Sequence, residues 1–275
     1  MLSQRLVAQR DAVTASLRAM RRVVVAFSGG VDSTLVAVLA RQALGKEHAL
    51  AVTADSPSMS RHDLQLARDI AAQTDLAHHI IATDEVANPD YRRNTEARCY
   101  FCKRTLFVEL ERLAAVQGFD AVLYGAIGDD QLSERPGQYA ALEHGVRAPL
   151  QEAGLAKWDV RELARELRLS NWDRPQNACL SSRIAHGQDV TEEKLAQIER
   201  AETTVRDEGF RQVRVRHQGE RASVEVGRDE IGRLGDAARR ARIAAALRVL
   251  GFVVVEFDPL GYRSAGAELT MQERD

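Results

Sequence analysis

Cysteine is scarce in this chain, and its scarcity is the first constraint on the class of protein. Three cysteines occur among 275 residues, and an odd count argues against a framework of disulfides. Long apolar runs are also missing, because no stretch approaches the ~20 apolar residues that a membrane-spanning helix needs. The N-terminal residues mix charged and apolar side chains in every turn, unlike a signal peptide. We therefore expect a cytoplasmic protein whose thiols stay reduced, with no membrane as partner.

An excess of charge of one sign is absent as well. The 38 Lys and Arg nearly balance the 40 Asp and Glu, so the formal net charge is −2. Nothing therefore attracts the whole chain to nucleic acid, and we expect no nucleic-acid partner. The composition, 45% hydrophobic and 28% charged, is that of an ordinary globular protein. A chain of this length forms one large domain or two modest ones.

Strand and helix patterns alternate regularly over the first 126 residues. Aliphatic, largely β-branched runs are typical of strands covered on both faces. They occupy residues 22–27, 48–55, 76–83 and 120–126. Helical spacing of apolar residues fills the remaining segments. These are residues 2–20, 31–44, 60–74 and 102–118. The alternation predicts an α/β fold, a parallel sheet with helices on both sides.

The pattern changes after residue 126. Residues 127–150 are rich in Gly, Asp, Arg and Pro and are expected to form a long loop. A helix at 159–169 and a second loop at 170–183 follow, the latter containing Pro175. The last elements are a helix at 191–208, strands at 212–217 and 222–227, a helix near 229–249 and a strand at 252–257. We expect a first domain over 1–170, and a cysteine loop with a smaller α+β domain over 171–275.

The stretch SGGVDS, residues 28–33, joins the first strand to a helix. A helix N-terminus carries free N–H groups and partial positive charge. Gly29 and Gly30 let the backbone approach an anion, and the hydroxyls of Ser28 and Ser33 add donors. The stretch matches neither a Walker A loop nor a GxGxxG turn. It therefore indicates a phosphate site, although a bare Ser-Gly-Gly is as often a tight turn.

The full run Ser-Gly-Gly-x-Asp-Ser after a buried strand resembles the PP-loop of the ATP pyrophosphatase superfamily. This resemblance implies a protein that cleaves ATP between the α- and β-phosphates to adenylylate a carboxylate or carbonyl. Asp32 would then position metal or nucleotide, and Thr53 and Ser56, at the tip of the second strand, would lie beside the adenine. Gly125 and Asp130 would complete the ATP site, with Mg²⁺ neutralising the polyphosphate.

Asp129 and Asp130 follow the fourth strand and are candidates for contact with this metal. The alternative for this pair is an acidic turn exposed to solvent.

Three further stretches, at 124–169, 172–187 and 209–226, resemble one family throughout. It is the LarE family, the ATP-dependent sulfur transferases of nickel-pincer nucleotide biosynthesis, and the likeness spans roughly residues 5–265. It implies adenylylation of pyridinium-3,5-biscarboxylic acid mononucleotide and replacement of carboxylate oxygen by sulfur. It also implies a homo-oligomer, since members of the family often form hexamers.

Cys99, Cys102 and Cys179 match the branch of this family in which three cysteines bind a [4Fe-4S] cluster and leave one iron open. A C-x-x-C pair can hold one edge of a cluster. Cys102 is expected to open a helix, where a thiolate is favoured. Alternatives are a buried apolar role, a redox dithiol, a zinc site completed by His186, and a Cys179 that donates its own sulfur.

The run FRQVRVRHQ alternates with a period of two, so Arg214 and Arg216 share one face of a strand. Such a face is usually only solvated. The family resemblance instead implies a clamp for the substrate phosphate, since arginine binds phosphate through two bonds. By the same resemblance Arg263 is a further basic residue of this substrate site, and Glu202 and Glu225 are acidic residues near it. Arg183, beside the Cys179 loop, is expected to meet a substrate carboxylate.

Three other functions fit parts of the sequence. A tRNA-thiolating PP-loop enzyme would also use cysteines, but the chain shows no basic excess or separate RNA-binding module. An amidating ligase such as NAD synthetase would use ammonia and would need no placed cysteines. A non-catalytic ATP-binding module would account for neither the cysteines nor the arginines.

Overall fold

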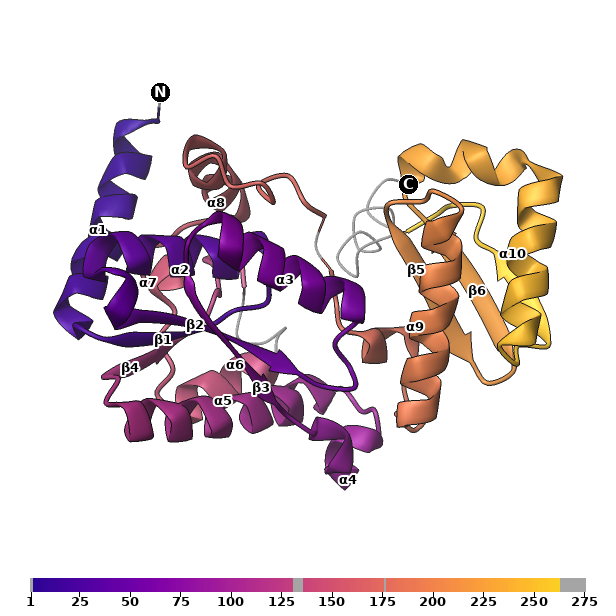
Figure 1. Cartoon of the computed structure of the whole chain (residues 1–275), viewed down its shortest axis with the longest axis horizontal. Coiled ribbons are helices and arrows are strands. Elements are labelled where there is room, and N and C mark those ends of the chain that lie inside the picture. The colour runs from indigo at the N-terminus through magenta and orange to yellow at the C-terminus, as the bar shows by residue number, and fades with distance from the viewer. Residues whose placement is uncertain (1, 131–135, 176, 263–275) are drawn as a thin grey trace, which may run out of the picture. The chain divides into compact units, whose positions relative to one another are not determined.

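The computed structural model describes residues 2–130, 136–175 and 177–262, so Arg263 lies outside the described residues. The chain divides into two compact units, Met1–Ala178 and Cys179–Asp275, whose elements are labelled in Figure 1. Within the described ranges, no helix is long and apolar enough to cross a membrane.

A four-stranded parallel sheet forms the centre of the first unit, with the order β3-β2-β1-β4. The strands are β1 Val23–Ala26, β2 Ala49–Asp55, β3 Ala77–Ala82 and β4 Ala121–Leu123. All four residues of β1 are buried, as expected of a central strand with covered faces. The predicted α/β class with a parallel sheet is confirmed.

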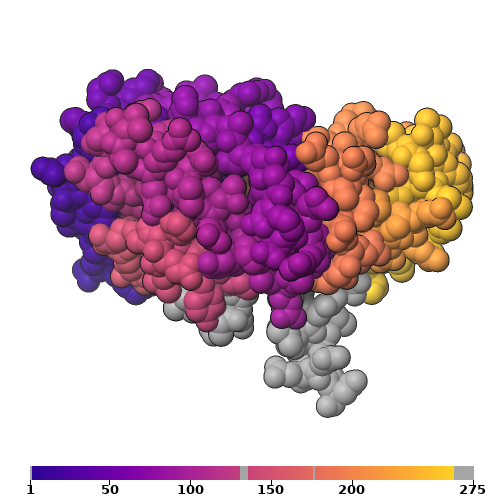
Figure 2. All heavy atoms as spheres, turned by 90° about the horizontal axis from the view of Figure 1, so that it is seen from below, coloured from indigo at the N-terminus to yellow at the C-terminus, as the bar shows by residue number. Residues whose placement is uncertain are grey.

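Helices cover both faces of this sheet. Val23 and Val25 of β1 pack into one apolar cluster with α1, α2, α3 and α8. Val24, which points to the opposite face, joins a second cluster with α5 and α6. These helices are α1 Gln4–Met20, α2 Val31–Leu44, α3 Arg61–Gln73, α8 Lys157–Glu166, α5 Arg98–Gln117 and α6 Pro136–Glu143. The layer with α5 and α6 is seen from outside in Figure 2.

Shorter elements complete the first unit and correct two expectations. The segment 127–150 is not a continuous loop, since α6 and α7 lie within it and begin at Pro136 and Pro149, where proline is pre-organised for a first turn. The helix α5 begins at Arg98, so Cys99 and not Cys102 lies in its first turn. The remaining short elements are η1 Lys46–His48, η2 Glu85–Ala87, α4 Pro89–Arg92 and α7 Pro149–Glu152.

The second unit is a three-stranded sheet packed against two helices. The strands β5 and β6 form the expected antiparallel hairpin, and β7 pairs parallel to β6. Val213 and Val215 of β5 pack against α9 and α10 in one apolar cluster. The elements are η4 Leu180–Arg183, α9 Glu192–Asp207, β5 Val213–Gln218, β6 Arg221–Val226, η5 Arg228–Gly235, α10 Ala237–Val249 and β7 Val254–Phe257.

The helix expected near residues 229–249 is divided in two. The 3-10 helix η5 ends at Gly235, and α10 starts after Asp236. The Asp236 carboxylate accepts hydrogen bonds from the backbone N–H groups of Ala238 and Arg239. This aspartate is therefore an N-cap that starts a new helix, a signal that the helical periodicity alone does not reveal.

Candidate functional site

A cavity of about 210 Å³ opens where β1, β2 and β4 end. Ligands bind at the carboxyl ends of parallel strands in folds of this kind. Six of the residues predicted to bind ATP line the cavity: Ser28, Gly30, Asp32, Ser33, Thr53 and Gly125. Gly29, Ser56 and Asp130 are not among its lining residues. The structure therefore brings most of the predicted ATP site together.

The phosphate loop, residues 28–33, closes one side of the cavity. Gly29 has a φ of +70°, and a Cβ there would lie 3.0 Å from the Cα of Ala67, so only glycine fits. The Ser33 hydroxyl accepts from the Ser28 N–H at 3.2 Å and donates to the Gly30 carbonyl at 3.1 Å. Gly30 is the N-cap residue of α2 and provides no side-chain cap. The first N–H groups of α2 are thus suited to an anion.

Gly125 permits a close approach between β4 and the phosphate loop. A Cβ on this residue would lie 2.6 Å from the backbone nitrogen of Ser33, much closer than real contacts allow. The glycine therefore sets the width of the cavity at the start of α2.

Two side chains from the end of the first unit hold the phosphate loop, and sequence reasoning missed both. Lys157 Nζ donates to both Asp32 carboxylate oxygens, at 2.8 and 2.7 Å. The buried Asn171 donates through Nδ2 to the Gly29 carbonyl and to Thr34 Oγ1, both at 2.9 Å. Lys157 begins α8 and Asn171 follows it, so this helix braces the loop. No local pattern links these residues to a loop more than 100 positions earlier.

On the β2 side of the cavity, Thr53 donates its hydroxyl to the Phe27 carbonyl at 2.7 Å. Its oxygen lies 2.8 Å from His78 Nε2, so the imidazole donates in return. Burial lowers the pKa of His78, and the charges of Arg68 and His79 lower it further. The adjoining Ser56 lies in a buried chain of polar groups with Ser58 and Glu85.

Lys103 and Tyr124 also line the cavity and were not predicted. The Lys103 ammonium lies 5.1 Å from the centre of the Tyr124 ring, a cation–π contact. Burial raises the pKa of Tyr124 to about 12, helped by the charge of Asp130. This phenol therefore stays neutral. Lys103, the residue that follows Cys102 on α5, contributes a positive charge to the cavity.

Each of the two aspartates after β4 accepts a hydrogen bond from a backbone N–H group. Asp130 Oδ2 accepts from the Ile127 N–H at 3.2 Å, and Asp129 Oδ2 accepts from the Lys157 N–H at 2.7 Å. Asp129 thus supports the start of α8. Contact of either carboxylate with a metal stays a prediction.

The three cysteines form no disulfide and are distributed over both units. Cys99 and Cys102 lie three residues apart on α5 and so share one helix face, Cys99 exposed and Cys102 partly buried. Cys179 is exposed and is the first residue of the second unit. Among the residues that the structure describes, no three or more His, Cys, Asp and Glu side chains form a group able to hold a metal ion.

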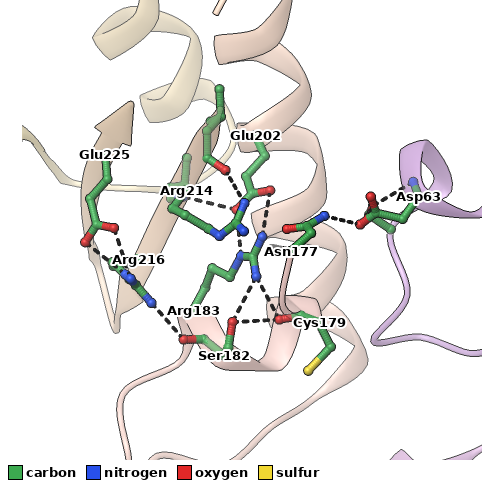
Figure 3. Close-up of polar contacts among 12 residues, drawn as sticks. Asp63, Asn177, Cys179, Ser182, Arg183, Glu202, Arg214, Arg216 and Glu225 are labelled. Carbon is green, nitrogen blue, oxygen red and sulfur yellow. Dashed lines mark hydrogen bonds and ion pairs between the residues drawn. The ribbon is translucent and has the colours of Figure 1, made fainter. Parts of the chain in front are cut away.

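A buried ion pair organises the chain after Cys179. The side chains of Arg183 and Glu202 are 1% and 0% exposed and join through Nε at 2.8 Å. Glu202 also accepts from Arg206 at 2.8 Å and from the Val215 N–H at 3.2 Å. Arg183 Nη1 in turn donates to the Cys179 carbonyl at 2.9 Å, as Figure 3 shows. Both predicted substrate residues are therefore part of the packing of this unit.

The arginines of β5 differ from each other in exposure. Arg216 is partly exposed and donates to Glu225 at 2.9 and 3.0 Å and to the Ser182 carbonyl at 3.1 Å. Arg214 is only 4% exposed, and its guanidinium lies 4.8 Å from the centre of the Tyr262 ring. Arg216 and Glu225 are consequently more accessible than Arg183, Glu202 and Arg214, the other predicted substrate residues that the structure describes.

Comparison with known proteins identifies the family. The NAD synthase family model matches residues 6–98, which contain the phosphate loop. The chain is 41% identical to an uncharacterized protein of Synechocystis over 88% of this chain and 90% of that protein. A tRNA-specific 2-thiouridylase of Beijerinckia indica is 29% identical over 55% of this chain and 43% of its own length.

A further match covers nearly the whole chain. The pyridinium-3,5-bisthiocarboxylic acid mononucleotide synthase of Lactiplantibacillus plantarum is 36% identical over 94% of this chain and 93% of that protein. Both units take part in this match, including the segment with Cys179. The chain therefore belongs to the family of the pyridinium-3,5-bisthiocarboxylic acid mononucleotide synthases, the LarE family.

Proposed function

We propose that this protein is an ATP-dependent sulfur transferase that converts pyridinium-3,5-biscarboxylic acid mononucleotide to the bisthiocarboxylic acid mononucleotide. The observation that carries the proposal is the 36% identity to the synthase over 94% of the chain. The cavity lined by the phosphate loop supports it, because its backbone and hydroxyl donors and its glycines suit the phosphates of a nucleotide. A homo-oligomer, by family resemblance a hexamer, is part of the proposal.

The first step is adenylylation of a substrate carboxylate. A carboxylate oxygen attacks the α-phosphorus of ATP, the bond to the bridging oxygen breaks, and pyrophosphate leaves. The phosphate loop holds the departing pyrophosphate through the N–H groups at the start of α2. Thr53 and Ser56 are the proposed adenine contacts. The carboxylate oxygen thereby becomes part of AMP, a much better leaving group.

Magnesium is expected to accompany ATP, and carboxylate oxygens are its preferred protein ligands. Asp32 lines the cavity and is the first candidate, with Asp130 as the second. Both oxygens of Asp32 accept hydrogen bonds from Lys157. Each carboxylate oxygen has more than one lone pair, so Asp32 can bind the metal while Lys157 stays hydrogen-bonded to it.

The second step transfers sulfur to the activated carbonyl. A sulfur nucleophile attacks the carbonyl carbon, the bond to the phosphate oxygen breaks, AMP leaves, and a thiocarboxylate results. Cys99, Cys102 and Cys179 are the residues proposed to hold this sulfur. Three cysteines that form no disulfide could be the three ligands of a [4Fe-4S] cluster, and the bound cluster would supply a replaceable sulfide. The alternative is that Cys179 donates its own sulfur and becomes dehydroalanine.

Binding of the substrate is assigned to the second unit. We propose that Arg214, Arg216 and Arg263 hold its phosphate, with Glu202, Glu225 and Arg183 in support. The accessible Arg216 is the strongest candidate, because a phosphate can replace its partner Glu225 with two parallel bonds. Arg183 and Glu202 act from within the packed unit.

The test of the proposal is pyrophosphate release that depends on the pyridinium substrate. Purified under anaerobic conditions, the protein should release pyrophosphate from ATP only when this mononucleotide is present, and the product should gain sulfur in place of oxygen by mass spectrometry. Pyrophosphate release with tRNA instead would establish a tRNA thiolase, the second candidate, which the similarity to a 2-thiouridylase favours. Release with neither substrate would refute both.

The role of the cysteines is tested separately. Iron and sulfide are measured in the anaerobic protein and in Cys99→Ala, Cys102→Ala and Cys179→Ala. If the three thiols hold a cluster, each substitution lowers iron and sulfide together. If Cys179 is the donor, iron is low throughout, and the intact mass falls by that of H₂S after turnover.

A further inference from the structure

Asp63, in the first turn of α3, accepts hydrogen bonds from three side chains. Ser60 Oγ donates at 2.8 Å, Arg174 Nη2 at 2.6 Å and Asn177 Nδ2 at 2.5 Å. Of these donors, Ser60 is the N-cap residue of α3 itself. The other two belong to the chain that leads to Cys179, and Figure 3 shows the Asn177 amide directed at the carboxylate. One partly buried carboxylate thus fixes this part of the chain to α3.

The contact is charged and largely withdrawn from water. The side chains of Asp63 and Arg174 are 17% and 21% exposed. Burial alone would raise the pKa of Asp63, but the hydrogen bonds from Ser60, Arg174 and Asn177 and the arginine charge lower it. The carboxylate is therefore ionised at neutral pH. A partly buried, charge-assisted contact of this kind is stronger than an exposed ion pair.

Cys179 lies two residues after Asn177. Consecutive Cα atoms are about 3.8 Å apart, so the Cα of Cys179 lies within about 8 Å of that of Asn177. On the other side of the cysteine, Arg183 and Ser182 Oγ donate to its carbonyl at 2.9 and 2.8 Å. The main chain is held before and after the cysteine, while its side chain is exposed.

We propose that Asp63 is a positioning residue for sulfur transfer, which holds the chain before Cys179 through Arg174 and Asn177. The inference rests on the proposed function and deepens it. Asp63 does not line the ATP cavity, so its contacts govern the second step and leave adenylylation unaffected. Sulfur transfer depends on placing the sulfur at the activated carbonyl, and a misplacement of about 1 Å can cost ~100-fold in rate.

Two variants break the contact in different ways. Asp63→Asn removes the charge, and Asn177→Ala removes one donor while leaving Ser60 and Asp63 at the start of α3 intact. Asp69→Asn is the matched control, because Asp69 is exposed on the same helix and accepts a hydrogen bond from the exposed Gln65 of that helix. All three proteins are compared with the unaltered chain under anaerobic conditions.

The readout separates the two chemical steps. We expect pyrophosphate release to stay within about 2-fold in Asp63→Asn and Asn177→Ala, and thiocarboxylate formed per pyrophosphate to fall ~10-fold or more. Asp69→Asn should match the unaltered chain in both. Equal losses in both steps, or no loss of transfer, would overturn the proposal. An unaltered chain that releases no pyrophosphate would instead refute the proposed function.

A second measurement needs no substrate. Amide hydrogen exchange in the peptide containing Asn177 and Cys179 should speed up ~10-fold in Asp63→Asn and remain unchanged in Asp69→Asn. Unchanged exchange in Asp63→Asn would overturn the positioning role whatever the activity.

Discussion

Asp32 places a negative charge within the loop that is proposed to hold phosphates. Lys157 neutralises this carboxylate through two short hydrogen bonds, with side-chain exposures of 31% and 27%. We expect Lys157→Ala to weaken ATP binding ~3- to 10-fold, because an unpaired carboxylate repels the polyphosphate and the loop loses its brace. Titration calorimetry with Mg²⁺ and ATP measures this change.

The control for this variant is Lys46→Ala. Lys46 is partly exposed and pairs with Asp75 beyond the last turn of α2, about 20 Å along the helix from the phosphate loop. Its removal should leave the affinity for ATP unchanged. Tighter binding in Lys157→Ala would show that the lysine blocks the site rather than supporting it.

The substitution Gly125→Ala tests whether the backbone beside the cavity has room for one added methyl group. Gly125→Ala would place a methyl group 2.6 Å from the Ser33 nitrogen, and neither backbone can yield without moving β4 or α2. We expect a loss of about 1–3 kcal/mol in the free energy of unfolding and weaker ATP binding, measured by urea denaturation and calorimetry. Gly232→Ala, where a Cβ meets nothing within 4 Å, is the control and should change neither quantity.

Single residues also show what the sequence could predict about the site. Ser28, Gly30, Asp32 and Ser33 were predicted because the signal is local, a contiguous motif between a strand and a helix. Lys157 and Asn171 were missed because they contact the loop only through the folding of a helix far along the chain. The burial of Arg183 against Glu202 was missed for the same reason, since charged residues are usually exposed.

At the scale of elements, β3 carries a titratable residue, His78, which contacts Thr53 in the lining of the cavity. The pKa of His78 is lowered below its ordinary value of 6.5, mainly by burial. As the pH falls below 6.5, the unfolded chain takes up the proton before the folded chain, so stability is lost in that direction and is unaffected above it. We expect the free energy of unfolding to fall between pH 7 and 5.5.

His78→Gln should reduce this fall by about 0.5 kcal/mol, a modest figure because the ring is only half-buried and solvent weakens the effect. Urea denaturation at the two pH values measures it. His48→Gln is the control, since His48 is exposed and is not among the groups that lower the pKa of His78. An equal reduction in both variants would contradict the assignment to His78.

The elements themselves were predicted where periodicity is long and uninterrupted. The four strands of the first sheet and the β5–β6 hairpin were predicted within a few residues. The helices α6 and α7 were missed because they are short and lie in a segment rich in Gly and Pro, where local pattern favours a loop. The division between η5 and α10 depends on one capping carboxylate, which the apolar pattern does not encode.

At the scale of the whole molecule, the two units have separate apolar cores. The first core consists of two clusters on either side of the parallel sheet, and the second is one cluster under β5 and β6. The ATP cavity lies entirely within the first unit, and the buried Arg183–Glu202 pair lies entirely within the second. We therefore expect a ligand or a substitution confined to one unit to change the free energy of unfolding of that unit alone.

The two tryptophans of the chain allow this to be measured. Trp158 and Trp172 both belong to the first unit, so their fluorescence reports its unfolding, while far-ultraviolet circular dichroism reports both units. ATP at about 100 times its Kd should raise the free energy of unfolding reported by fluorescence by ~2.7 kcal/mol.

Glu202→Gln should leave the fluorescence transition unchanged. It should lower the free energy of unfolding of the second unit, seen by circular dichroism, by about 3 kcal/mol, because Arg183 is left buried without its charge partner. Glu192→Gln, an exposed carboxylate at the start of the same helix, should shift it by less than about 1 kcal/mol. A single transition that moves identically in both signals would show instead that the two cores unfold as one.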